Sequence, residues 1–385
     1  MNDQTEKLRE RVLAAAADKT PLRIRGGGTK DFYGNPPVGE LLETAGHAGI
    51  VAYEPTELVV TARAGTPLAE LEAVLAEQGQ MLAFEPPHFS DHPVGRASAR
   101  RLKEVPAGQA TADVGLKADL HGATVGGCVA AGLSGPRRAA AGSVRDFVLG
   151  VKVLDGKGEV LNFGGQVMKN VAGYDVSRLM TGALGTLGLL LEVSLKVLPR
   201  PAAEATLRLE LPQDKAIETM NRWGGQPLPV SATCWHDDLL TVRLSGARAA
   251  VAAAREKLGG EAVDDAATFW ESVREQRHGH FTGEEAQWRL SLPSDCAPLD
   301  LPGAPLIEWG GALRWLAFDG EASVVRAAVA AAGGHAMLFR GGDKVKSAAG
   351  VFQPLPDAVM QLQRKLKRAF DPQRLFNPGR LYPEL

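Results

Sequence analysis

The residues best suited to chemistry lie in one short run, Arg25-Gly-Gly-Gly-Thr-Lys30. Three consecutive glycines place no side chain between the backbone and a ligand, so their N–H groups can converge on an anion. Thr29 adds a hydroxyl, and Arg25 and Lys30 add positive charge on either side. Hydrogen bonds to a charged group contribute roughly 1.5–3 kcal/mol each, so four or five of them could hold a pyrophosphate. The run therefore predicts a phosphate site, with a structural glycine turn as the alternative.

A second glycine-rich run, Ala123-Thr-Val-Gly-Gly-Cys-Val-Ala-Ala-Gly132, follows about a hundred residues later. By itself such a run is typical of tight backbone packing. Two glycine-rich runs in one half of a chain, one of them flanked by cations, favour a ligand of dinucleotide size. The first run fits neither G-x-G-x-x-G nor a Walker A loop, so the two common nucleotide-binding folds are not indicated.

The histidine, cysteine and serine patterns give no comparable site. His88 and His92 are four residues apart, but the prolines around them disfavour the helix that this spacing needs to bind a metal. The three cysteines are far apart and odd in number, which fits a reducing compartment and argues against a disulfide or zinc framework. Neither a paired-carboxylate motif nor a nucleophile elbow is present. We predict no metal site and assign no catalytic residue.

Strands and helices alternate in the first half of the chain without a strict βαβ repeat. Apolar and alternating runs predict strands over residues 21–25, 49–53, 58–63, 147–154 and 160–163. A helix follows from the apolar stripe Leu68, Leu71, Val74 and Leu75. We expect Thr66 to cap this helix, with Pro67 at its first position and Gly79 at its end.

Glycines and tryptophans divide the chain in two. Of the 44 glycines, 27 precede residue 201, whereas all six tryptophans lie between residues 201 and 330, where we expect them to pack a core. The boundary is expected at Pro199-Arg200-Pro201. Residues 90–122, rich in arginine and small side chains, are expected to form a mobile surface insertion.

A last helix is predicted after Pro356 and before Asp371-Pro372. Its apolar face would consist of Val359, Leu362, Leu366 and Phe370. Its other side would carry a basic face, either solvated or in contact with a phosphate or a partner, formed by Arg364, Lys365, Lys367 and Arg368.

The composition is that of a globular protein of two to three domains. The chain has 385 residues, 45% hydrophobic and 23% charged, and its formal charge of −2 gives no basic field for nucleic acid. The longest run without a charged residue, Leu120–Pro136, contains five glycines in 17 residues, whereas a membrane span needs about 20 predominantly apolar ones. The N-terminal residues lack the apolar core of a signal peptide, so we expect a cytoplasmic protein without a membrane-spanning segment.

Together the motifs resemble those of a known family. The two glycine runs, with Gly173-Tyr-Asp175 and the string at 182–188, resemble the FAD-binding domain of the vanillyl-alcohol oxidase (PCMH) type. Longer strings resemble the FAD-binding subunits of bacterial glycolate oxidases, at residues 84–89, 135–138, 142–150, 167–180, 306–315 and 376–382. The resemblance covers nearly the whole chain outside residues 90–122.

The resemblance implies an α+β fold and non-covalent FAD. A PCMH-type FAD-binding domain of two subdomains would span residues 1–200, an α+β cap domain 201–350, and a helix and tail returning to the FAD domain 351–385. The pyrophosphate would lie against Arg25, Gly26, Gly27, Gly28, Thr29 and Lys30. Other implied cofactor contacts are Thr124, Gly126 and Gly127 on the second side, Ser143 and Asp146 near the flavin, Gly185 and the backbone of Leu189 near the adenine half, and Asn377.

The resemblance also implies a complex that oxidises glycolate to glyoxylate. The partners would be a homologous FAD-containing catalytic subunit and an iron–sulfur subunit, in the cytoplasm or at the inner membrane through those partners. Related catalytic flavoproteins often have a glutamate where this chain has Leu184, and a histidine-rich stretch followed by an acidic residue and an asparagine where it has only His335. We therefore predict an FAD-binding accessory subunit that acts beside a catalytic one.

Two alternatives stay open. The first is an autonomous FAD-dependent 2-hydroxy-acid dehydrogenase, with Arg314 holding the substrate carboxylate and His335 as the base. The second is a structural subunit that no longer holds flavin. The cations beside the first glycine run argue against the second alternative, because a vestigial loop has no need of them.

Overall fold

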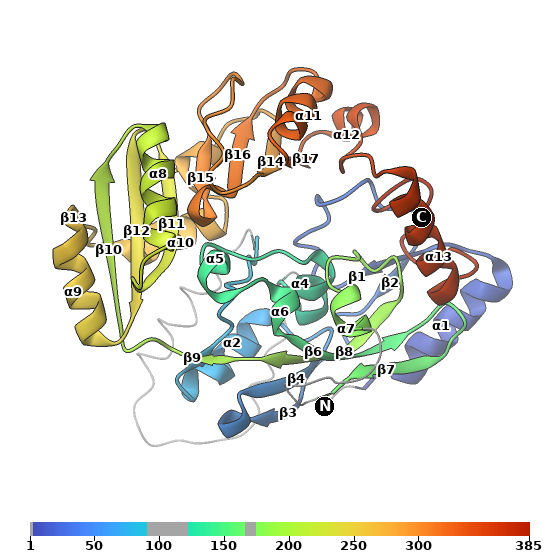
Figure 1. Ribbon diagram of the computed structural model, residues 1–385. Helices are drawn as coiled ribbons and strands as arrows, with labels where there is room; N and C mark the ends of the chain where they lie inside the picture. Colours follow the sequence, from blue (N-terminus) through green and yellow to red (C-terminus); the bar gives the residue numbers. More distant parts are fainter. Residues whose placement is uncertain (1–2, 91–121, 166–174) are drawn as a thin grey trace.

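The computed structural model describes residues 3–90, 122–165 and 175–385. These residues form an α+β fold with two main sheets, of five and eight strands, as the sequence predicts. Figure 1 shows the smaller sheet below and the larger sheet above, with α4 and α5 between them. Residues 91–121 of the expected insertion, and residues 167–174 of the string at 167–180, lie outside the described residues.

The smaller sheet belongs to the first half of the chain, and each of its neighbouring strand pairs is antiparallel. Its order is β3 (Ile50–Glu54), β4 (Val59–Arg63), β8 (Leu189–Lys196), β6 (Val148–Leu154) and β7 (Val160–Gly164). A separate parallel pair joins β1 (Leu22–Arg25) to β2 (Glu40–Glu43). All five predicted strands of this half are confirmed, as β1, β3, β4, β6 and β7.

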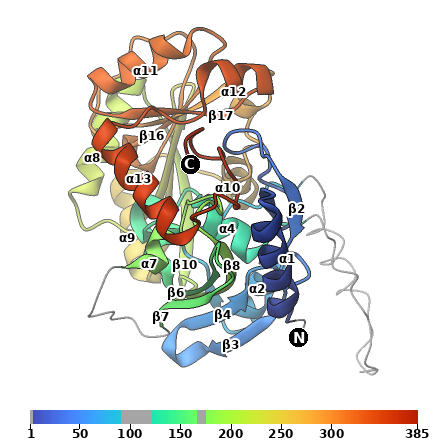
Figure 2. The same ribbon diagram turned by 90° about the vertical axis from the view of Figure 1, so that its right-hand side faces the viewer.

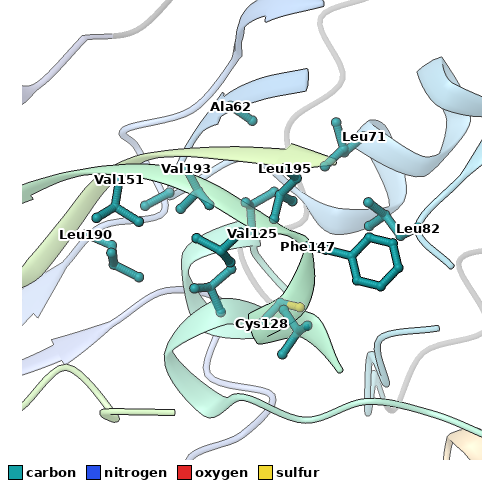
Figure 3. Close-up of a cluster of buried hydrophobic side chains, with 14 of the residues drawn as sticks. Ala62, Leu71, Leu82, Val125, Cys128, Phe147, Val151, Leu190, Val193 and Leu195 are labelled. Carbon is teal, nitrogen blue, oxygen red and sulfur yellow. The ribbon is translucent and has the colours of Figure 1, made fainter. Parts of the chain in front are cut away.

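The core of this first domain lies between the smaller sheet and the helices α2 (Leu68–Glu77) and α4 (Val125–Ala131). Figure 3 shows Leu71 of α2, Val125 of α4 and Val193 of β8 in this core. Further elements of the domain are α1 (Thr5–Asp18), a two-stranded pair of β5 (Gln80–Met81) and β9 (Leu198–Pro199), α5 (Arg138–Ala141), α6 (Val144–Phe147) and α7 (Val176–Leu179). None of the helices in the described parts of the chain has the length and apolar character needed to cross a membrane.

The helix cap expected at Thr66 is wrong. The side chain of Pro67, which precedes α2, offers no cap, and the Thr66 hydroxyl bonds instead to Gly49, accepting from its N–H at 2.9 Å and donating to its carbonyl at 3.1 Å. The hydroxyl is therefore used to close the turn before β3. The expected end of the helix is confirmed, because Gly79 follows it in the left-handed region at φ +64°.

The larger sheet belongs to the second half of the chain, and its paired strands are antiparallel. Its order is β13 (Glu261–Ala262), β10 (Ala203–Glu210), β12 (Leu239–Gly246), β11 (Val230–His236), β15 (Leu306–Glu308), β16 (Leu313–Ala317), β14 (Gln287–Ser291) and β17 (His335–Arg340). One face is covered by α8 (Gln213–Gly224), α9 (Arg248–Leu258) and α11 (Ala322–Ala331). The opposite face packs against α10 (Ala266–Arg274) and the first domain. All six tryptophans are buried, as predicted.

The chain ends with α12 (Asp343–Ala349) and α13 (Asp357–Phe370), after which it pairs with the first domain through a bridge between Leu22 and Phe376. In Figure 2, α13 runs from the side of the larger sheet down toward α7. The helix is confirmed, but its predicted faces are partly wrong. Lys367 is 2% exposed, whereas Leu362 is 56% exposed. Lys367 is buried because its ammonium forms an ion pair at 2.8 Å with the buried Asp371.

A buried ionic network fixes the larger sheet against the first domain. The Glu85 carboxylate accepts hydrogen bonds from the backbone and side chain of Arg137, at 2.9 and 3.3 Å, and from Arg243 of β12 at 2.9 Å. Burial opposes ionisation of Glu85, but the charges of the two arginines outweigh it and lower the pKa of the carboxyl. This contact therefore joins β12 of the larger sheet to the first domain.

Candidate cofactor site

A cavity of about 110 Å³ lies where the two glycine runs meet. It is bounded by the segment after β1, the start of α4, the segment entering β8 and the C-terminal turn. Twelve of the fourteen predicted cofactor residues line it: Arg25, Gly26, Gly27, Gly28, Thr29, Lys30, Thr124, Gly126, Gly127, Gly185, Leu189 and Asn377.

The other two predicted residues, Ser143 and Asp146, do not line this cavity. They form the capping box of α6, in which the Asp146 carboxylate accepts from the backbone N–H of Ser143 at 2.9 Å and from its hydroxyl at 2.8 Å. Burial opposes ionisation of Asp146, but these hydrogen bonds outweigh it and lower its pKa. Both side chains therefore cap the N-terminus of α6.

The two glycine runs pack directly against one another. A Cβ on Gly27 would lie 1.6 Å from the carbonyl oxygen of Gly122, and one on Gly26 would lie 2.4 Å from the hydroxyl of Thr124. Any larger residue would force the loops apart, so the sequence needs glycine at both positions. Tight backbone packing does not exclude an anion cradle here, because the glycines that pack against the second run also line the cavity.

The first run leaves backbone donors available. Among the described residues, the N–H groups of Gly27, Gly28 and Thr29 have no hydrogen-bond acceptor. Three consecutive free N–H groups on the wall of a cavity form the kind of nest that binds a phosphate. The residues present thus fit the pyrophosphate of a dinucleotide.

The two cations of this run differ in availability. Arg25 forms an ion pair with Asp31 at 2.8 Å, whereas Lys30 has no ion pair with any carboxylate in the described parts of the chain. The Lys30 ammonium lies 3.5 Å from the His88 carbonyl and 5.6 Å from the centre of the Phe89 ring. Burial lowers its pKa, which is the expected cost of enclosing a cation before an anion binds. Lys30 is therefore the charge best placed for an anionic ligand.

The C-terminal turn closes the cavity. Asn377 accepts a hydrogen bond from the Ile24 N–H at 2.8 Å and donates one to the Leu184 carbonyl at 2.6 Å. Arg380, which also lines the cavity, donates to the Asp31 carbonyl at 2.8 Å. Sequence reasoning missed Arg380, although it lies in the string at 376–382 that carries the family resemblance.

The size of this cavity limits what it can hold. Most small-molecule sites have roughly 300–1,000 Å³, so only one part of a dinucleotide fits between the glycine runs. A larger hollow of about 660 Å³ lies elsewhere, between α12, α13 and the C-terminal turn. None of the predicted cofactor residues lines that hollow. The smaller cavity, where the free donors are, is therefore the better candidate for the cofactor site.

The pair proposed for an autonomous dehydrogenase is wrong, because Arg314 and His335 point to opposite faces of the larger sheet. Arg314 of β16 and Ala336 of β17 both pair with Leu290 of β14, so these three side chains lie on the same face of the sheet. His335 is the neighbour of Ala336 in β17. Neighbouring residues of a strand face opposite sides. In addition, the buried guanidinium of Arg314 donates to the carbonyls of Ala297, at 2.9 Å, and Cys296.

Glu308 is a buried carboxyl on the sheet face that looks toward the first domain. It accepts a hydrogen bond from the indole N–H of Trp315 at 2.8 Å, and burial raises its pKa to about 7. The folded protein therefore binds more protons than the unfolded chain between about pH 4.5 and 7. The stability that the proton provides is present below this interval and is lost as the pH rises through it.

We expect Glu308→Gln to remove this pH dependence, because glutamine accepts the same hydrogen bond without ionising. Between pH 5 and pH 8 the natural protein should lose on the order of 3 kcal/mol of unfolding free energy that the variant keeps. Urea unfolding at the two pH values, followed by tryptophan fluorescence, measures the difference. An equal loss in both proteins would contradict the assignment.

The fold and the site define a class, the FAD-binding flavoproteins with a second domain above the cofactor domain. The sequence matches the FAD binding domain family over residues 3–101 and 108–164. The fold is similar to that of 4-ethylphenol oxidase from Gulosibacter chungangensis, with a TM-score of 0.67 at 13% identity over 100% of this chain and 88% of that one. It is also similar to alkyldihydroxyacetonephosphate synthase, with a TM-score of 0.62 at 14% identity over 99% and 76%.

The particular family follows from the sequence. Over 383 residues the chain is 47% identical to glycolate oxidase subunit GlcE of Escherichia coli K12, covering 100% of this chain and 99% of that protein. The chain belongs to the family of this subunit. A shorter match, 39% identical over 84 residues, links 22% of the chain to 18% of glycolate oxidase subunit GlcD of Bacillus subtilis strain 168. The resemblance predicted from the motifs is confirmed.

Proposed function

We propose that this chain is the FAD-binding accessory subunit of a complex that oxidises glycolate to glyoxylate. The observation that carries the proposal is the row of free N–H groups on Gly27, Gly28 and Thr29, beside Lys30, in the cavity between the glycine runs. The 47% identity over the full length to a glycolate oxidase subunit supports glycolate as the substrate. When bound, FAD would accept the hydride that glycolate loses from its carbinol carbon.

The chain's own residues would bind and orient the cofactor. The nest and Lys30 would hold the pyrophosphate, with Thr124, Gly126 and Gly127 on the facing wall. Gly185, Leu189 and Asn377 would border the adenine half. None of the described residues lining the cavity is a histidine or a cysteine. FAD would be held without a covalent bond.

The partners would be a homologous FAD-containing catalytic subunit and an iron–sulfur subunit. The three cysteines lie in separate elements and remain unpaired, and no described group of three His, Cys, Asp or Glu side chains has the arrangement of a metal site. Any iron–sulfur centre of the complex would therefore come from a partner. We propose that the complex is cytoplasmic, either in solution or at the inner membrane through its partners.

The two alternatives are less well supported. An autonomous dehydrogenase built on Arg314 and His335 would need both side chains on one face of the sheet. A structural subunit without flavin would have no use for three N–H donors without an acceptor, beside a lysine without an ion pair, among the described residues.

The purified chain should retain one FAD per chain, released by denaturation and identified by absorbance and mass. Alone it should reduce a dye with glycolate poorly, and adding the catalytic and iron–sulfur subunits should restore glycolate-dependent reduction. The matched control is the complex without this chain, which should be inactive. Absence of FAD after incubation with an excess would overturn the proposal, and so would full activity of the complex without this chain.

A further inference from the structure

The last helix, α13, has an exposed face that the chain does not use for its own packing. Residues four, seven and eleven positions apart lie on one side of a helix. On α13 this side carries Ala358, Leu362, Lys365 and Ala369, with Val359 beside them, and all five residues are exposed. These five residues form the outer face of α13. In Figure 2, α13 lies on the side of the molecule that faces the viewer.

The outer face is largely apolar and has the shape of a contact between two helices. Leu362, which is 56% exposed, lies between the small side chains of Ala358 and Ala369, which would let the backbone of a second helix approach closely. The large apolar side chains of the opposite side, Leu366 and Phe370, already pack against the core of the first domain. The helix therefore keeps one apolar side for its own fold and presents another to the outside.

Three exposed cations, Arg364, Lys365 and Arg368, give the same part of α13 a positive charge. Among the residues that the structure describes, none of the three forms an ion pair with a carboxylate, and the ion pair within this region belongs to Lys367. Asp357 is the only acidic residue of α13, and it lies at the start of the helix. The three cations are therefore complementary to an acidic partner.

The hollow of about 660 Å³ adjoins this surface. Side chains of α13 and of the C-terminal tail are among those that line it: Met360, Gln361, Arg364, Leu381 and Glu384. Side chains of a second protein can enter such a hollow, whereas the surface of a bilayer is flat on this scale and would leave it empty. A helix that lies in a bilayer surface also buries its whole apolar side in the lipid, and the larger part of that side of α13 is already packed. These observations favour a protein over a membrane.

We propose that the outer face of α13 and the adjoining hollow dock an amphipathic helix of a partner subunit. Apolar side chains of that helix would pack against Leu362, and its aspartates and glutamates would pair with the three cations. The inference rests on the proposed function, because that function gives this chain its partner subunits. It adds the surface through which the accessory subunit joins them.

The test measures the affinity of the FAD-loaded chain for the catalytic subunit, the iron–sulfur subunit and the two together. The natural chain should bind saturably, and its affinity should fall as the salt concentration rises because exposed charge pairs are screened. Leu362→Asp should weaken binding by about tenfold to a hundredfold, since it removes the apolar centre of the contact. The combined variant Arg364→Glu, Lys365→Glu and Arg368→Glu should weaken binding by about tenfold or more and remove most of the salt dependence.

Arg255→Glu, at an exposed position of α9, is the matched control for charge reversal and should leave binding unchanged. Ala369→Arg keeps the positive charge of the surface but adds bulk to the contact, so it should also weaken binding. Thermal unfolding and FAD content show whether each variant folds, and Ala369→Arg decides the matter if Leu362→Asp does not fold.

Unchanged binding to the partner subunits in the folded variants would overturn this inference and leave the proposed function intact. Two other outcomes would also overturn it. One is binding of the natural chain, but not of the triple variant, to phosphatidylglycerol vesicles with no effect on the subunits. The other is a dimer of the natural chain that Leu362→Asp converts to a monomer. Failure of the natural chain to retain FAD, or to bind the partner subunits in any combination, would refute the proposed function itself.

Discussion

Replacing Gly27 by alanine is expected to abolish FAD retention by the purified chain. The added methyl group would lie 1.6 Å from the carbonyl oxygen of Gly122, a backbone atom that cannot turn away as a side chain can. The two glycine runs would have to separate, and the three free N–H groups would lose their convergence on a phosphate. The FAD released per denatured chain, measured by absorbance, should fall from near one to near zero.

Gly224→Ala is the matched control for this change. Gly224 is an exposed residue at the end of α8, and a Cβ there would meet no atom within 4 Å. Alanine in a helix is favoured over glycine by about 1 kcal/mol, so the control should be as stable as the natural chain or more so. Normal FAD content in a folded Gly27→Ala chain would show that the runs do not form the cradle.

Replacing Lys367 by methionine is expected to lower the free energy of unfolding by about 3–5 kcal/mol. The Lys367 ammonium pairs with Asp371 at 2.8 Å and donates to the carbonyls of Thr186 and Phe376, at 2.6 and 2.8 Å. Asp371 is fully buried, so removing the cation would leave its carboxylate uncompensated. Urea unfolding followed by tryptophan fluorescence measures the change.

Lys365→Met is the control for this prediction, because Lys365 lies two residues away on the exposed side of α13. A surface substitution of this kind should change the free energy of unfolding by less than about 0.5 kcal/mol. Since Lys367 ties α13 to the segment before β8 and to the C-terminal turn, its loss should also weaken FAD retention. Equal stability of the two variants would show that the buried pair contributes no more than a surface lysine.

Local patterns sufficed for much of this protein. Alternating apolar residues predicted the strands of the smaller sheet, because the spacing of buried positions follows from strand geometry alone. Three adjacent glycines between cations predicted the anion cradle, because backbone freedom and charge are local properties. Motif resemblance then brought Thr124, Gly185 and Asn377 to the same site, and all three line one cavity in the structure.

The tertiary structure decided which residues that are far apart in the sequence become neighbours. A Cβ on Gly27 would lie 1.6 Å from Gly122 because of the way two loops pack. The local sequence pattern does not determine that packing. The sequence pattern predicts Lys367 as one of several surface cations. In the structure, Asp371 and two carbonyls enclose its ammonium. Arg314 and His335 form one candidate pair in the sequence, and only strand pairing reveals that they lie on opposite faces of the larger sheet. The sequence alone determines the periodicity of a strand. Which face of the strand contacts another domain is determined only by the packing of the domains.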